Sequence, residues 1–232
     1  MRTAPDPFIK PSLFKNAKFR TGVVTGFCLF SIFIGILFLI PLMLNDIHAL
    51  NTSQIGLILF PGAISSVAFG PIAGSLADRK GNTFVVSLGL LLLIASMILM
   101  SFLMGVSALI VAAALLLTYV GFSLSQTAMI NSVSQTLPEH ETGVGMGLFN
   151  LVSIISGALG TALVGKILSG KWLEIPLVPA LSLPRGFAYS NLMIAFSVVI
   201  TLGGILYLRS FRTVKEMKPV SEEVKGEPLK IS

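Results

Sequence analysis

Gly74–Gly81 reads Gly-Ser-Leu-Ala-Asp-Arg-Lys-Gly and stands between two long apolar runs, Ile55–Ala77 and Phe84–Met104. Each run is long enough to cross a bilayer as a helix, which takes about 20 mostly apolar residues. Gly81 can adopt the positive φ that a tight reversal of the chain requires. The stretch is therefore predicted to be a short charged turn between two membrane-spanning helices.

The chain as a whole is strongly apolar, because 54% of its 232 residues are hydrophobic and only 11% are charged. Soluble domains carry about 25% charged residues, so most of this chain must contact membrane lipid. Its apolar runs are too long and too continuous for barrel strands. We therefore predict an all-α membrane protein with six transmembrane helices. The six runs are Thr21–Leu44, Ile55–Ala77, Phe84–Met104, Ser107–Ile130, Gly143–Leu168 and Phe187–Leu208.

Lysine and arginine are unevenly distributed over the segments that flank these runs. With the N-terminus in the cytoplasm, 13 of the 16 basic residues fall on the inner side and three on the outer side. Inner segments are enriched in Lys and Arg, so both termini are predicted to be cytoplasmic, and the net charge of +6 indicates no nucleic-acid partner. The predicted domains are a cytoplasmic segment (residues 1–20), a six-helix transmembrane domain (residues 21–208) and a disordered cytoplasmic tail (residues 209–232).

The sequence lacks the motifs of common catalytic and cofactor-binding sites. It has no Ser/His/Asp set, no zinc motif and no phosphate-binding GxxxxGK[ST], so neither an enzyme activity nor a cofactor is expected. Glu139-His140-Glu141 is interpreted as a solvated charged loop rather than a metal site. The six apolar runs contain no carboxylate or histidine that would carry a proton through the membrane.

Two of the apolar runs carry small residues at every fourth position. Such a stripe lets a neighbouring helix approach closely. It is compatible with static packing of the helices and also with close-packed helices that move against each other. The stripes are Gly62, Ser66, Gly70 and Gly74 in the second run, and Ser153, Gly157, Thr161 and Gly165 in the fifth.

Tyr119, Ser123 and Gln126 form a polar face on the fourth run, at positions i, i+4 and i+7. Polar side chains are costly against lipid, so this face is expected to contact another helix or to line a water-filled cavity. Asn150 in the fifth run has the same two interpretations. Phe30 in the first run would add an aromatic wall to a cavity or would contact lipid.

Asp78 places a carboxylate at the membrane edge. There it can lie against the positive N-terminal end of another helix. A contact of this kind depends on how the helices pack, so it would act as a latch.

The pattern Gly-x-Leu-Ala-Asp-Arg-x-Gly between two spans resembles the cytoplasmic loop motif of the major facilitator superfamily. Three further stretches, Asn51–Gly56, Gly143–Asn150 and Tyr189–Leu192, resemble the C-terminal half of the fourteen-span drug:proton antiporters, and the Gram-positive tetracycline exporters most of all. The resemblance covers roughly residues 10–210. The chain departs from the family motif at Asn82 and Thr83, where basic residues are usual. It also has Gly157 where the tetracycline exporters carry a glutamate.

The resemblance implies one six-helix half of a transporter, built as a 3+3 inverted repeat, that exports amphipathic drugs in exchange for protons across a bacterial plasma membrane. The proton site is then expected in a missing N-terminal half or a second subunit. Spans one and four would line the cavity, and spans two and five would contact the other half. By analogy, the substrate contacts are Tyr119, Ser123, Gln126 and Phe30, and the inner gate comprises Gly74, Asp78, Arg79 and Gly81.

Two other interpretations remain open at this point. One is a split or homodimeric transporter made of six-span chains that meet at the small-residue stripes. The other is a non-transporting membrane scaffold, or the membrane domain of an ATP-driven exporter, and it leaves Gly74–Gly81 unexplained.

Overall fold

In the computed structural model, residues 15–170 and 186–211 are described, and six long helices account for nearly all of these residues. All six are long and apolar enough to cross a membrane, which confirms the predicted all-α, six-span architecture. The helices are α2 (Ala17–His48), α3 (Thr52–Lys80), α4 (Asn82–Leu103), α5 (Ala108–Ser134), α6 (Glu139–Ser169) and α7 (Phe187–Phe211).

Most helices extend beyond the apolar runs from which they were predicted. The first begins at Ala17, within the segment expected to precede the membrane domain, because the Asn16 side chain accepts hydrogen bonds from the backbone N–H groups of Lys18 and Phe19. The last continues to Phe211. The tail predicted to be disordered begins at residue 209, but residues 209–211 form the end of α7. Residues 212–232 lie outside the described part of the chain.

The stretch Gly74–Gly81 is mostly helical, and the prediction of a multi-residue turn was too broad. Residues 74–80 continue α3 without a break, and α4 begins at Asn82. Gly81 alone makes the reversal, with φ 85° and its N–H donated to Ala77 O at 2.8 Å. Only a residue without Cβ adopts that φ readily.

The other end of α3 is fixed by a capping box. Asn51 Oδ1 accepts from the Gln54 N–H, and Gln54 Oε1 accepts from the Asn51 N–H, each at 3.0 Å. Both residues belong to the stretch Asn51–Gly56 that resembles the antiporters. The motif therefore has a local structural reason in this chain, because it starts α3.

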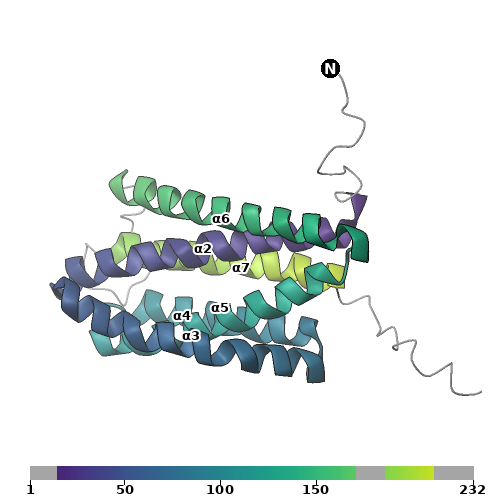
Figure 1. Ribbon diagram of the computed structural model, residues 1–232. Helices are drawn as coiled ribbons and strands as arrows, with labels where there is room; N and C mark the ends of the chain where they lie inside the picture. Colours follow the sequence, from purple (N-terminus) through teal and green to yellow (C-terminus); the bar gives the residue numbers. More distant parts are fainter. Residues whose placement is uncertain (1–14, 171–185, 212–232) are drawn as a thin grey trace, which may run out of the picture.

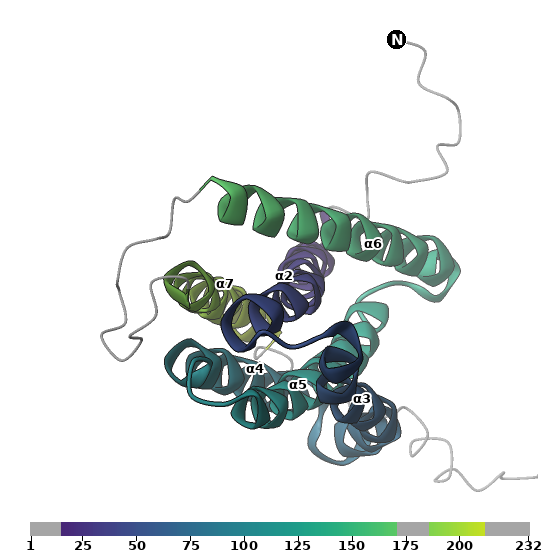
Figure 2. The ribbon, with the colours of Figure 1, turned by 90° about the vertical axis from the view of Figure 1, so that its left-hand side faces the viewer.

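The helices form two interleaved groups of three. The first group is α2, α3 and α4, and the second is α5, α6 and α7. The second helix of each group packs on the first helix of the other group, so α3 packs on α5 and α6 packs on α2. The third helices, α4 and α7, contact each other (Figure 1 and Figure 2). Consecutive helices run in alternate directions, so α2 and α5 are antiparallel. This exchange of equivalent helices agrees with the expected 3+3 inverted repeat.

Close crossings and buried hydroxyl groups hold α4 and α7 to the rest of the bundle. A Cβ added at Gly89 in α4 would come within 2.6 Å of Gly121 O in α5, so the two backbones touch at this crossing. Ser101 and Ser190 link α4 to α7 through their hydroxyl oxygens at 2.7 Å. Tyr207 donates to Ser132 Oγ at 2.6 Å and links α7 to α5.

A candidate substrate-binding face

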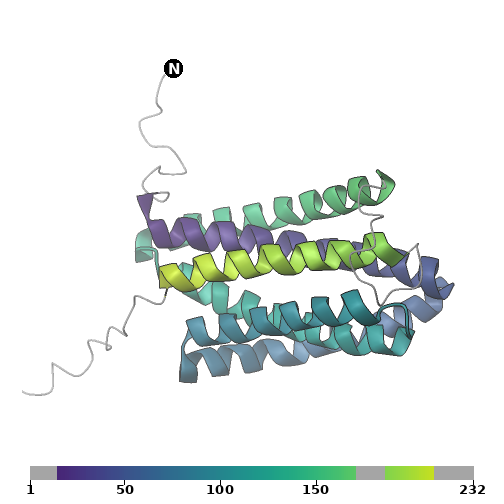
Figure 3. The ribbon, with the colours of Figure 1, turned by 180° about the vertical axis from the view of Figure 1, so that it is seen from behind.

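One broad face of the bundle is formed by α6, α2, α5 and α3, and is called the front face here (Figure 1). The opposite, back face shows α7 and α4 (Figure 3). The two helices that flank the front face are the least buried of the six described helices: 4 of the 29 residues of α3 and 7 of the 31 residues of α6 are buried, against about two-fifths or more of each of the other four. Lipid or a further protein body must therefore cover α3 and α6 more than any other helix.

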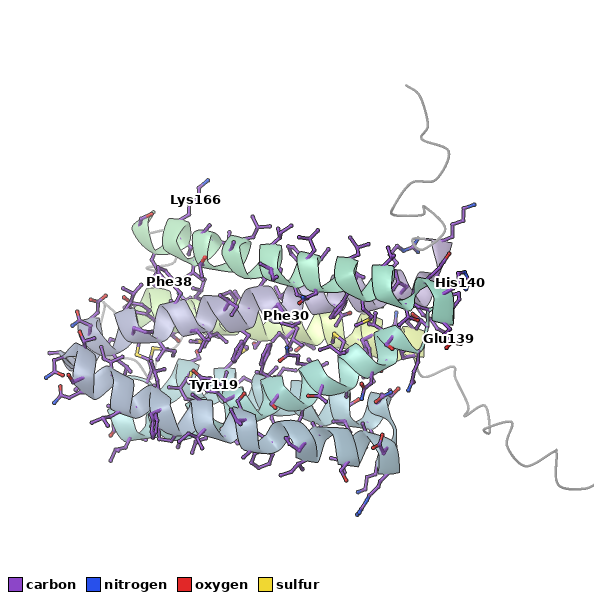
Figure 4. The ribbon with its side chains drawn as sticks, in the orientation of Figure 1. Phe30, Phe38, Tyr119, Glu139, His140 and Lys166 are labelled. Carbon is purple, nitrogen blue, oxygen red and sulfur yellow. The ribbon has the colours of Figure 1, made fainter. Side chains whose placement is uncertain are left out.

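Five aromatic rings form a continuous cluster across the front helices. Phe33 stacks on Phe122 with the ring centroids 3.5 Å apart, and Phe33 meets Tyr119 edge to face at 5.6 Å. Phe30 meets Phe122 at 5.4 Å and Phe149 at 6.4 Å, both edge to face. This ring cluster joins α2, α5 and α6. Figure 4 shows Phe30 and Tyr119 well between the two ends of the bundle, which Glu139 and Lys166 mark on α6.

Phe30 and Tyr119 were predicted as site residues from the sequence, whereas Phe33, Phe122 and Phe149 were not. A signal was available for two of the three. Phe33 follows Phe30 by three residues and Phe122 follows Tyr119 by three, so each pair shares a helix face. The sequence alone did not indicate which ring would meet which across the helices.

Tyr119 lies directly on α3 at Gly62. A Cβ added to Gly62 would collide with the Tyr119 ring, so the absence of a side chain there lets the ring pack directly against α3. One turn further along, Ser123 Oγ donates to Ser66 O at 2.9 Å. Ser123 is buried, and its hydroxyl is engaged in the α3–α5 contact, so the structure does not leave it free for a substrate.

Gln126 lies on α5 one helical turn after Phe122 and Ser123. Phe122, four residues earlier, faces α2, and Ser123, three residues earlier, faces α3. At about 100° per residue, Gln126 points between these two directions, toward the side of α5 that lies between its contacts with α2 and with α3. It is half-buried, and no other residue in the described ranges is bonded to its amide.

The small-residue stripes contribute to packing over only part of their length. Every step of four residues turns about 40° past one full turn, so a stripe at fixed four-residue spacing drifts around the helix. In α6, Ser153 and Gly157 are buried, and an added Cβ at Gly157 would contact Ile34 of α2, while Thr161 and Gly165 are only partly buried. The closest approach is at Gly160, where an added Cβ would collide with Ser31 O, and the sequence prediction missed this residue.

The charged end of α3 is open. Asp78, Arg79 and Lys80 are all exposed, and a Cβ at Gly74 would meet no atom within 4 Å. Lys80 Nζ lies 5.1 Å from the centre of the Phe84 ring. Asp78 forms no hydrogen bond or ion pair within residues 15–170 and 186–211. Its carboxylate is therefore available to a group outside the described part of the chain.

Basic side chains gather at one end of the bundle, called the basic end. They come from the start of α2, the end of α3 and the end of α7, and α6 begins at the same end with Glu139, His140 and Glu141. At the opposite end α6 carries Lys166 (Figure 4). Glu139, His140 and Glu141 were interpreted as a loop from the sequence, but they form the first turn of α6, where the helix dipole favours negative charge. The basic residues are Lys15, Lys18, Arg20, Arg79, Lys80 and Arg209.

At the opposite end, polar contacts tie α2 to its neighbours. Tyr189, at the start of α7, donates its hydroxyl to Asp46 Oδ2. His48 Nε2 lies 2.7 Å from Met104 O, just after α4. These contacts fix the end of α2 against both back helices.

Comparison with known proteins identifies relatives with matching sequence over most of this chain. The lincomycin resistance protein LmrB of Listeria monocytogenes is 28% identical over 169 residues, covering 72% of this chain and 36% of LmrB. The multidrug resistance protein Stp of Mycobacterium tuberculosis is 24% identical over 180 residues, which cover 78% of this chain and 33% of Stp. The MFS-type transporter YwoD of Bacillus subtilis is 28% identical over 167 residues, which cover 71% of this chain and 37% of YwoD. The chain thus spans about a third of the length of these relatives.

The sequence also matches a protein family over more than half of its length. The family model described as Major Facilitator Superfamily matches residues 2–161. The match includes the charged end of α3, the ring cluster and the start of α6. The chain therefore belongs to the major facilitator superfamily, a family of membrane transporters and not of enzymes.

Proposed function

We propose that this chain supplies one six-helix half of an efflux transporter that exports amphipathic drugs in exchange for protons. The proposal rests on the front face, where the ring cluster lies about one helical turn from Gln126, the residue four positions after Phe122 on α5. An apolar, aromatic wall with a few polar groups is typical of sites for drug-sized molecules. Two of the relatives are named for resistance to lincomycin and to multiple drugs.

Phe30, Tyr119 and Gln126 are the proposed substrate contacts. The two rings offer apolar surface, and their π faces attract cationic groups. Gln126 offers both a hydrogen-bond donor and an acceptor. Ser123 supports the site indirectly, because it holds α3 beside Tyr119 through Ser66 O. Tetracycline-like compounds are one substrate class that combines rings with polar groups in this way.

The end of α3 is proposed to act as the inner gate. Asp78 and Arg79 are exposed, and Gly74 leaves free space beside them. The N-terminal end of a helix from a second six-helix body would provide the positive partner for the Asp78 carboxylate. Gly81 sets the direction in which α4 leaves this gate.

The basic end is proposed to face the cytoplasm of a bacterial cell. The described basic residues other than Lys166 lie at that end, as do the two ends of the membrane domain near Lys15 and Phe211. Segments rich in Lys and Arg stay inside, so both termini would be cytoplasmic in the plasma membrane.

The second half is expected to carry the proton-binding group. Between the charged ends of its helices, the described part of this chain contains no Asp, Glu, Lys or Arg. A transporter that exchanges drugs for protons needs an ionisable group within the membrane. The partner half, on the same chain or on a separate one, would supply it.

Transport into membrane vesicles tests the proposal. Vesicles would contain this chain alone, or this chain joined to a candidate N-terminal half, and uptake of lincomycin and tetracycline would be measured with and without an imposed pH gradient. We expect gradient-driven uptake only with both halves present. Uptake that is the same with and without the pH gradient would contradict proton exchange. If the joined protein took up neither drug, the result would contradict efflux. Uptake by this chain alone would indicate a homo-oligomer.

A further inference from the structure

Asn150 in α6 is an exposed amide deep inside a membrane-spanning helix. It lies eleven residues after Glu139, which places it about 16 Å along the helix from the basic end. Its side chain is exposed, and no residue of the described ranges hydrogen-bonds it. An amide facing lipid at that depth is costly. The Asn150 amide must therefore form its hydrogen bonds with water, with a ligand or with a further protein body.

The helical register places Asn150 on the side of α6 that faces the front of α2. It precedes Gly157 by seven residues, about 20° short of two full turns, so the two lie on the same side. A Cβ at Gly157 would contact Ile34 of α2 at 3.2 Å, and Ile34 follows Phe30 by four residues. Asn150 therefore points along the same edge of the front face as Phe30.

Asn150 also lies at the depth of the ring cluster. The preceding residue, Phe149, is 6.4 Å from Phe30 and would lie 2.7 Å from a Cβ at Gly26. On the other side of Phe30, Gln126 follows the contacting residue Phe122 by about one turn of α5. Two amides from different helices thus lie within about one helical turn of residues that contact the Phe30 ring, and neither amide has a hydrogen-bond partner in the described part of the chain.

We infer that Asn150 and Gln126 form a pair of amides that binds uncharged hydrogen-bonding groups of the substrate while the Phe30 ring cluster holds its apolar part. An amide both donates and accepts, so carbonyl, hydroxyl and amide groups fit this pair. No charged side chain of the described front helices lies between their ends. This inference rests on the proposed efflux function and names the substrate class: amphipathic molecules with neutral polar groups next to an apolar body.

Cysteine labelling tests the position of Asn150. In a Cys28→Ser background within the complete two-half transporter, single cysteines would replace Asn150, Gln126 and Leu151. Leu151 is the matched control, because it is the next residue, about 100° around α6, and is 52% exposed. A negatively charged methanethiosulfonate reagent modifies only thiols that water reaches.

We expect the reagent to label the cysteines at 150 and 126 but not at 151, and lincomycin to slow labelling at 150 at least threefold. Labelling at 126 without labelling at 150 would overturn this inference, but it would still agree with the proposed substrate site at Phe30, Tyr119 and Gln126. Labelling at neither position would overturn both. Labelling at 150 that lincomycin does not slow would contradict a substrate contact.

Binding of two probes tests the substrate class. Lincomycin carries amide and hydroxyl groups, whereas tetraphenylphosphonium has aromatic rings and no hydrogen-bonding group. Asn150→Leu is expected to weaken lincomycin binding roughly 3- to 10-fold, the scale of one neutral hydrogen bond, and to change tetraphenylphosphonium binding less than twofold. Phe30→Ala should weaken both. An equal loss of both probes with Asn150→Leu would show that Asn150 acts on folding, and no loss would show that it contacts no substrate.

Discussion

At the scale of single residues, two glycines of α3 differ in what surrounds them. An added Cβ would collide with the Tyr119 ring at Gly62 and would meet nothing within 4 Å at Gly56. We predict that Gly62→Ala lowers the free energy of unfolding by about 1–3 kcal/mol, the usual cost of overpacking. Gly56→Ala should be neutral or stabilise by up to about 1 kcal/mol. Denaturant titration of the purified chain in detergent measures both. If the two substitutions changed the free energy of unfolding equally, the result would contradict the close packing of Tyr119 against Gly62.

Two serines of α5 provide a second test at this scale. Ser123 Oγ donates to Ser66 O, whereas the buried Ser125 Oγ has no partner in the described structure. Ser123→Ala is predicted to cost about 0.5–1.5 kcal/mol of stability, because a hydrogen bond is lost. Ser125→Ala is predicted to be neutral or stabilising, since it removes a buried polar atom without a partner. Thermal unfolding of the two variants side by side would show whether this order is correct.

At the scale of elements, α6 is attached mainly through its crossing with α2. Ile34 Cβ lies 3.5 Å from the Cβ position of residue 157, a separation that suits a disulfide. With Cys28 replaced by serine, the pair Ile34→Cys and Gly157→Cys is predicted to cross-link under mild oxidation. Adding Gly160→Val should abolish the cross-link, because the valine would collide with Ser31 O.

Gly165→Val is the control for this experiment, since the nearest atom to an added Cβ there is Phe38 Cε1 at 3.9 Å. The cross-link should survive that change. Mobility shift on a denaturing gel reports the cross-link directly. If Gly160→Val left it intact, the α2–α6 crossing would be looser than the structure indicates.

At the scale of the whole molecule, the exposed Asp78 is proposed to need a second body. In the complete transporter, Asp78→Asn is predicted to lower drug efflux at least tenfold with unchanged expression, because the neutral amide is attracted less to a helix N-terminus. Glu139→Gln is the matched control. It removes one exposed carboxylate at the same end of the bundle and should leave efflux within about twofold. Normal efflux by Asp78→Asn would rule out the gating role.

The sequence alone determined the number of spans, the uneven distribution of basic residues and the reversal at Gly81. These properties are local or additive: a span needs a continuous apolar run, and a reversal needs a residue that tolerates positive φ. The polar positions Tyr119 and Gln126 were also predictable, because helical periodicity places them on one face.

Only the tertiary structure decided which helix each face meets. It turned Ser123 toward α3, joined Phe33, Phe122 and Phe149 into the ring cluster, and made Gly160 the closest point between α2 and α6. The physical reason is that a stripe of fixed four-residue spacing drifts about 40° per step. Contact therefore depends on where two helices cross, and the crossing is set by both partners together.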